Sequence, residues 1–168
     1  MLVILRLIHI VCGVFWAGTI FFFVSYLEPS VRNVGPDGGK VMVQMFTRRF
    51  LTALPVIALL TILAGVWLMW ITSKGFDATW VRSPLGRGIS IGAAAAVVGF
   101  IIGVTAMRPA GMRMWAIARE MPQTQDESRR AALMAEAGAL RDKSRSALRA
   151  VAVFLFIAVV AMATARYW

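Results

Sequence analysis

The feature that most constrains this chain is its division into four long apolar blocks. They cover residues 2–26, 51–71, 89–107 and 147–167. Each block approaches or exceeds the about 20 apolar residues that a helix needs to cross a bilayer. In lipid the backbone must satisfy its own hydrogen bonds, and the blocks lack the alternating polarity of membrane barrel strands. The sequence therefore predicts an all-α polytopic membrane protein, a four-transmembrane-helix bundle in a single domain over residues 1–168.

The first block differs from a cleaved signal peptide, which has an apolar core of about 7–15 residues and then a small-residue cleavage site. Here the apolar run continues to Val24 and ends in Ser-Tyr-Leu-Glu-Pro. We expect the block to remain as the first span. Pro29 should end this helix, because proline lacks a backbone donor and disfavours helical geometry in the residue before it.

Positive charge is distributed unevenly between the two sides of the expected bundle. The segments after the first and third spans carry 13 of the 18 Lys and Arg residues. Basic residues collect in cytoplasmic loops. We therefore expect a multi-pass protein of the inner (plasma) membrane with both termini outside the cytoplasm. The net charge of +10 then reflects topology and contact with anionic lipid, and we expect no nucleic-acid partner.

The two basic segments are expected to be helical. Residues 108–149 are polar, helix-forming and interrupted by Pro122, so they should form a cytoplasmic helical hairpin whose second arm, 126–149, continues into the fourth span. Residues 41–46 should form a short amphipathic helix, with Asp37 as its N-cap. The turn before it ends in Gly-Gly-Lys. It lacks the first glycine and the final Ser or Thr of a phosphate loop, and it follows a membrane helix rather than a strand.

The contents of the spans disfavour several classes of protein. Spans two to four carry no Asp, Glu or Lys at depth, whereas proton-coupled transporters keep ionisable groups along their paths. Paired broken helices, which occur in many transporters, are not evident. There is no Ser-His-Asp set and no acidic pair, so the expectation leans against an enzyme. Met112 and Met114 are soft ligands that suit copper, but methionine at such positions is more often a packing residue.

Small residues form a stripe along the third span. Its members recur at spacings of three and four, on one helical face, and are Gly88, Gly92, Ala96, Gly99 and Gly103. Such stripes let the backbones of membrane helices approach closely. We expect close packing within the monomer, with a dimer seam or one wall of a flat cofactor pocket as alternatives.

The first span holds the only histidine and the only cysteine of the chain, His9 and Cys12. Arg6, Gly13 and Trp16 lie near the same helical face as His9, at spacings of three and four. An ionisable group inside a membrane helix is costly and usually has a partner. The function predicted for this chain therefore depends on what His9 contacts.

Short motifs in the first part of the chain resemble a known group of proteins. Leu7-Ile8-His9 and Phe15-Trp16-Ala17-Gly18 resemble the first helix of small membrane proteins related to copper-resistance protein D, and HemJ-type protoporphyrinogen oxidases share a similar start. An uncharacterised four-helix family of bacterial membrane proteins in that neighbourhood is more similar still. It shares Glu28-Pro29-Ser30, the Gly35-Pro36-x-Gly38-Gly39-Lys40 turn and Arg48-Arg49-Phe50. The resemblance covers roughly the first seventy residues and implies a membrane helical bundle.

The resemblance also implies a cofactor. In HemJ-type proteins a first-helix histidine is associated with haem b, and the matching position in this chain is His9. Those oxidases use a lysine in a later helix, and the third span here has none. Copper-resistance D proteins usually carry more His and Met than this chain. Both departures count against oxidase activity and copper transport.

Two interpretations of His9 follow. In the first, a neutral His9 forms a hydrogen bond to another helix and Arg6 extends to the outer surface. In the second, His9 is the axial ligand of haem b, Gly13 leaves room for the macrocycle, Trp16 forms an apolar wall and Arg6 pairs with a propionate. With one histidine per chain, bis-histidine ligation needs two chains or a second ligand such as Met. A different metal held by His9 and Cys12 would have only two ligands.

These interpretations correspond to two functions. One is a haem-binding membrane protein with a redox or haem-handling role. The other is a non-enzymatic helical module for assembly or partner binding. The expected partners are the lipid bilayer and either a second copy of the chain or another membrane protein.

Overall fold

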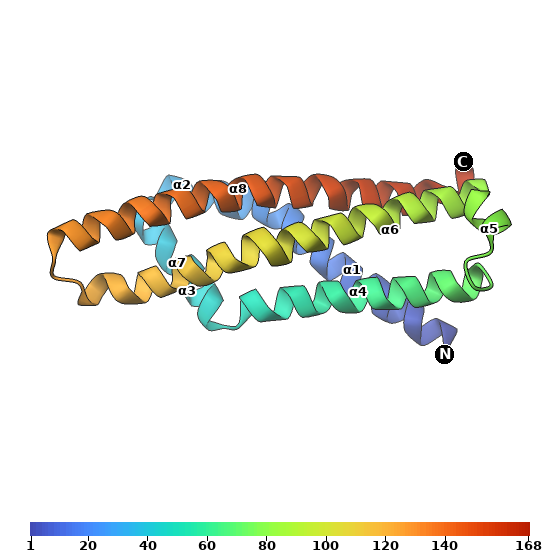
Figure 1. Ribbon diagram of the computed structural model, residues 1–168, viewed down its shortest axis with the longest axis horizontal. Coiled ribbons are helices and arrows are strands. Elements are labelled where there is room, and N and C mark those ends of the chain that lie inside the picture. Colours follow the sequence, from blue (N-terminus) through green and yellow to red (C-terminus); the bar gives the residue numbers. More distant parts are fainter.

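The structure, a computed structural model, describes residues 1–168 apart from the side chain of Pro36. Its long helices run side by side along the longest axis of the molecule (Figure 1). The elements are α1 (Leu2–Phe22), η1 (Phe23–Leu27), α2 (Glu28–Val34), α3 (Pro36–Thr47), α4 (Phe50–Thr72), α5 (Ala78–Arg82), α6 (Pro84–Ile102), η2 (Gly103–Met107), α7 (Arg108–Glu120), η3 (Met121–Gln123), α8 (Glu127–Thr164) and η4 (Ala165–Tyr167). The η1 and η2 segments are π-helical, whereas η3 and η4 are short 3₁₀ turns.

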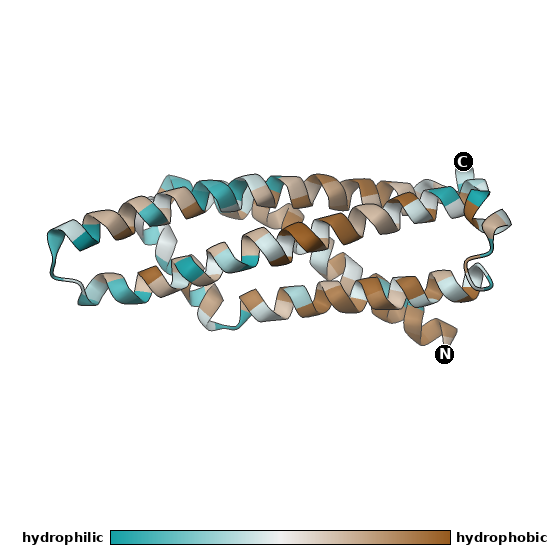
Figure 2. Ribbon diagram, in the orientation of Figure 1, coloured by the Kyte–Doolittle hydropathy of each residue, from teal (hydrophilic) through white to brown (hydrophobic). Residues whose placement is uncertain are grey.

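Four helical stretches are long and apolar enough to cross a membrane. They are Leu2–Val34, Phe50–Thr72, Pro84–Gln123 and Glu127–Tyr167. Hydrophobic residues dominate the half of the bundle that carries both chain termini, and hydrophilic residues gather where α7 joins α8 (Figure 2). We call the first half the terminal end and the other, formed by residues 28–49 and 108–149, the basic end. The predicted all-α bundle of four apolar helices is confirmed.

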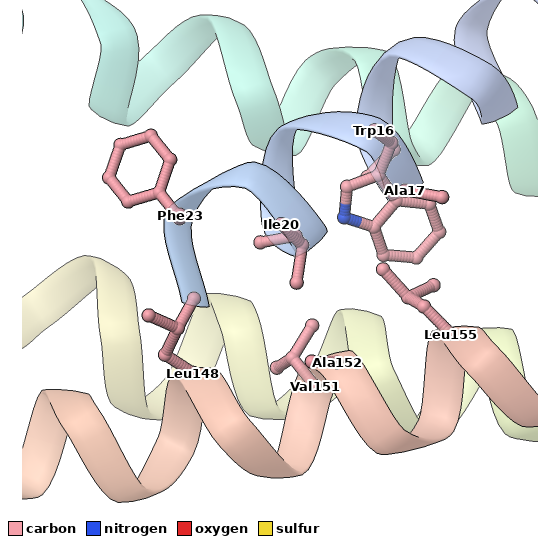
Figure 3. Close-up of a cluster of buried hydrophobic side chains, with 9 residues drawn as sticks. Trp16, Ala17, Ile20, Phe23, Leu148, Val151, Ala152 and Leu155 are labelled. Atoms are coloured by element: carbon pink, nitrogen blue, oxygen red, sulfur yellow. The ribbon is translucent and has the colours of Figure 1, made fainter. Parts of the chain in front are cut away.

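The four spans pair into two antiparallel units. In the first hairpin α1 packs along α4, and in the second hairpin α6 packs along α8, while the two hairpins touch each other less extensively. A buried apolar cluster joins them at mid-length. It contains Trp16, Ala17, Ile20, Phe23, Ala58, Leu148, Val151, Ala152 and Leu155. Trp16 and Ile20 of the first span lie toward Leu155 and Val151 of α8 in this cluster (Figure 3). Phe23 points away from α8 and stacks on Phe50, with ring centroids 5.2 Å apart.

The small-residue stripe of the third span packs inside the monomer for part of its length. A Cβ at Gly88 would lie 2.7 Å from the Cβ of Ala165, and one at Gly92 would lie 2.6 Å from Cγ of Met162 and 3.0 Å from the Ala158 carbonyl oxygen. These contacts confirm close packing of α6 against α8. Farther along the stripe, a Cβ at Gly103 would meet nothing within 4 Å.

The first span does not end at Pro29, contrary to the expectation from the sequence. The helix continues to Val34 through the π-helical η1, where the Glu28 N–H donates to the Phe23 carbonyl oxygen. Proline cannot donate to the carbonyl four residues before it and its ring crowds that group, so a wider turn carries the helix past it. The expected helix end at Pro29 is therefore wrong, because the π-helical turn accommodates the backbone hydrogen bond that proline cannot donate.

The third span contains the same kind of π-helical turn. The Arg108 N–H donates to the Gly103 carbonyl oxygen across η2, directly before Pro109. The two sites share a sequence pattern, in which Val24-Ser25-x-Leu27-Glu28-Pro29-Ser30 matches Val104-Thr105-x-Met107-Arg108-Pro109-Ala110 at an offset of 80 residues. The first and third spans thus each contain a π-helical turn directly before a charged residue and a proline, and both helices continue through it without interruption.

The connections at the basic end agree in outline with the sequence. Pro122 interrupts the helix after the third span, and α8 then runs unbroken into the fourth span, as predicted. The amphipathic helix α3 also forms, but Asp37 is not its N-cap. Gly35 occupies the N-cap position, with φ of 74°, and Asp37 instead forms an ion pair with Lys40 at 2.6 Å.

Candidate functional site

His9 forms a direct link between the first and second spans. Its Nδ1 atom lies 2.8 Å from the backbone carbonyl oxygen of Thr61 in α4. A carbonyl oxygen only accepts, so Nδ1 carries the hydrogen in this contact; in the neutral form of the ring the lone pair then lies on Nε2. The Thr61 hydroxyl donates to the Ile57 carbonyl oxygen at 3.0 Å, which holds that side chain along its own helix. His9 therefore has the interhelical partner that a polar group inside a membrane helix needs.

Two glycines allow α1 and α4 to come close at this point. A Cβ at Gly65 would lie 2.7 Å from Cε1 of His9 and 2.8 Å from its Nδ1. A Cβ at Gly13 would lie 3.3 Å from Cγ2 of Thr61. The imidazole of His9 thus packs against the backbone of Gly65, and the Thr61 side chain packs against the backbone of Gly13.

The structure separates the four residues that the sequence grouped as a cofactor site. His9 and Gly13 lie in the α1–α4 contact, whereas the Arg6 side chain is exposed. Trp16 is 4% exposed and belongs to the core between the hairpins, with its ring edge-to-face to Phe100 at a centroid distance of 6.5 Å. The space beside Gly13 is taken by Thr61, so a haem does not fit between α1 and α4. Haem iron on Nε2 would have to lie outside this contact.

A chamber with a volume of about 1100 Å³ lies between the two hairpins. Its inner end is lined by apolar side chains of the core, including Trp16, Ile20 and Phe100. From there it extends toward the basic end as far as α2, α3 and α7. The lining residues Trp16 and Glu28 are 12 positions apart on one helical stretch, about 18 Å at 1.5 Å per residue. The chamber is therefore elongated along this helical stretch.

Charged side chains line the chamber only toward the basic end. They comprise one carboxylate and five cations, namely Glu28, Arg32, Lys40, Arg108, Arg141 and Arg145. Glu28 Oε1 accepts from Nε of Arg145 at 2.6 Å, which neutralises the carboxylate and connects the two hairpins. Among the described residues, Arg32, Arg108 and Arg141 have no acidic group within ion-pair distance. The chamber thus combines an apolar interior with a net positive end.

One further polar group of the chamber has no hydrogen-bond partner among the described residues. Ser144 lines the chamber, and its Oγ is buried without a hydrogen-bond partner in the described part of the chain. Buried hydroxyls are normally hydrogen-bonded, because leaving one unpaired costs free energy.

The π-helical breaks help to shape the chamber. Phe23 of η1 and Gly103, Val104 and Met107 of η2 all line it, and the open space beside Gly103 belongs to it. The charged residue that follows each break, Glu28 in the first hairpin and Arg108 in the second, faces the same chamber. The sequence analysis missed this site. The repeated Val-Ser/Thr-x-Leu/Met-charged-Pro pattern marks only the two π-helical turns that line the chamber.

The described residues contain no group of three or more His, Cys, Asp and Glu side chains that could hold a metal ion. Cys12 is a free, partly buried thiol. Comparison with known proteins gave no matching family model, no matching curated protein and no matching solved structure.

Proposed function

We propose that this protein is a non-enzymatic membrane module that binds an amphiphilic molecule in the chamber between its two hairpins. The observation that carries the proposal is the chamber of about 1100 Å³, apolar at its inner end and charged at the other. Ligand sites commonly lie between helices of bundles and combine apolar walls with a few polar groups.

The same arrangement favours a site on the cytoplasmic side of the plasma membrane. Thirteen of the 18 basic residues belong to the segments at the basic end, which by the distribution of charge would face the cytoplasm. A molecule in the chamber would then place its apolar part at membrane depth, near Trp16, and its polar part near that surface.

A chamber-filling substitution tests the proposal. Gly103→Phe places a ring in the chamber, and Gly18→Phe is the matched control, because Gly18 is exposed and a Cβ there also meets nothing within 4 Å. Native mass spectrometry of delipidated protein after addition of phosphatidylglycerol and phosphatidylcholine should show one retained lipid on wild type and Gly18→Phe. Retention should fall at least about tenfold in Gly103→Phe. A wild type that retains no lipid, or equal retention in both variants, would exclude the chamber as a binding site.

A second candidate function is haem b binding at His9, and one observation favours it. The Thr61 carbonyl oxygen fixes the Nδ1–H, which leaves the Nε2 lone pair available; metal-ligating histidines commonly have this arrangement. Haem, when bound, would supply one-electron chemistry. Such a haem would lie outside the α1–α4 contact, and a second copy of the chain could supply a further ligand.

The haem candidate has a direct spectroscopic test. Protein purified in mild detergent from cells with full haem supply should show a Soret band that disappears in His9→Ala. Arg6→Ala should weaken the band less, because an exposed contact with a propionate contributes less than the bond to iron. A colourless, folded wild type would leave His9 as a structural hydrogen-bonding residue.

A further inference from the structure

We infer that the chamber's ligand is an anionic phospholipid, whose phosphate is bound by Arg108 and whose acyl chains fill the apolar interior between the hairpins. This inference rests on the proposed function, and adds to it the charge and chemical class of the ligand.

The charges of the chamber identify Arg108 as the main anion-binding group. Arg145 is already occupied by Glu28 at 2.6 Å, and Lys40 by Asp37 at 2.6 Å. Arg108 is partly buried and has no acidic partner among the described residues. A guanidinium binds phosphate oxygens through two parallel hydrogen bonds, and such a pair is stronger when partly shielded from water.

Two more cations and one hydroxyl surround the same part of the chamber. Arg32 and Arg141 line it and are exposed, so they raise the local positive potential and attract an anion without being neutralised by a carboxylate. Ser144 offers a buried hydroxyl without a partner, which could donate to a phosphate oxygen. The basic residues disfavour a neutral or cationic ligand, because their charges would then remain uncompensated.

The dimensions of the chamber favour a phospholipid over a smaller anion. Its volume of about 1100 Å³ exceeds the usual range of roughly 300–1,000 Å³ for pockets that hold drug-sized ligands. The apolar part reaches inward from Glu28 as far as Trp16, which suits acyl chains and gives a free phosphate nothing to fill. Basic pockets between membrane helices on the cytoplasmic side are a recognised mode of binding acidic lipid head groups.

The inference is tested by competition between lipids that differ only in the head group. Delipidated protein is titrated in mild detergent with phosphatidylglycerol or phosphatidylcholine of identical acyl chains, and the bound fraction is read by native mass spectrometry. Wild type should bind phosphatidylglycerol at least about tenfold more tightly. Arg108→Gln should reduce this preference to within about threefold while still binding both lipids, since the apolar interior is unchanged.

Arg119→Gln is the matched control. It removes the same charge from the same helix, but Arg119 lies over the Trp115 ring and does not line the chamber. The variant should therefore keep the wild-type preference for phosphatidylglycerol. A loss of preference in Arg119→Gln as large as that in Arg108→Gln would show that only the overall charge matters, and would overturn the inference.

The remaining outcomes separate this inference from the proposed function. Equal binding of both lipids to wild type, abolished by Gly103→Phe, would overturn the anionic assignment and leave the chamber as an amphiphile site. Binding of neither lipid would exclude both. Titration with oleate forms a third arm, in which tighter binding of oleate than of phosphatidylglycerol would assign the chamber to a single-chain carboxylate and overturn the phospholipid.

Discussion

Gly65 lies so close to the imidazole of His9 that a Cβ at this position would be 2.7 Å from Cε1 of the ring. The ring cannot retreat without losing its hydrogen bond to the Thr61 carbonyl oxygen. We therefore expect Gly65→Ala to destabilise the protein by about 1–3 kcal/mol, the usual cost of overpacking a close contact. The thermal midpoint of unfolding in detergent measures this effect.

Two comparisons make the Gly65 experiment specific. Gly18→Ala is the control, because a Cβ there meets nothing within 4 Å, and it should leave the midpoint unchanged or raise it. Adding His9→Ala to Gly65→Ala should recover part of the lost stability, since the clashing ring is then absent. If Gly65→Ala unfolds at the same temperature as wild type, the imidazole does not rest on this glycine.

From the contact between α6 and α8 we expect substitutions at two glycines of the stripe to lower the thermal midpoint by different amounts. A Cβ at Gly92 would lie 2.6 Å from Met162 Cγ and 3.0 Å from the Ala158 carbonyl oxygen, whereas one at Gly99 would be 3.6 Å from its nearest neighbour, Phe154. Gly92→Ala should therefore lower the thermal midpoint and Gly99→Ala should change it little. Equal midpoints for the two variants would mean that the helices separate readily at Gly92.

Hydropathy and charge were sufficient to predict the spans, because lipid imposes a minimum length and an internally bonded backbone on any segment that crosses it. They were insufficient at Pro29. The usual rule treats proline as a helix stop, but the π-helical turn before it preserves the helix at the cost of one displaced hydrogen bond. The same π-helical turn occurs a second time in the chain, before Pro109.

The candidate site, too, could be predicted from the sequence only in part. The sequence identified His9 as a residue that needs a partner, but not that the partner is a backbone carbonyl of Thr61, because every helical residue offers one. The chamber depends on how far two hairpins separate. No local pattern determines that distance, although Glu28 and Arg108 occupy matching positions after the two breaks.

The Glu28–Arg145 ion pair joins residues 117 positions apart and connects the hairpins beside the chamber. Both side chains are 24% exposed, so solvent screens the pair only partly. A double-mutant cycle with Glu28→Gln and Arg145→Gln should give a coupling energy of about 0.5–3 kcal/mol. The Glu120–Arg129 pair, at 35% and 50% exposure, is the control and should couple more weakly. A coupling energy at Glu28–Arg145 no larger than that of the control pair would show that this ion pair does not hold the hairpins together.

The orientation of the bundle is predicted by its basic residues and tested by labelling single cysteines. In a Cys12→Ser background, Thr79→Cys places an exposed thiol at the terminal end and Gln125→Cys places one at the basic end. Because the segments of the basic end carry 13 of the 18 Lys and Arg residues, they should face the cytoplasm. An impermeant maleimide should then label Thr79→Cys on intact cells, and Gln125→Cys only after permeabilisation. The opposite pattern would invert the topology and would place the positive end of the chamber outside the cytoplasm.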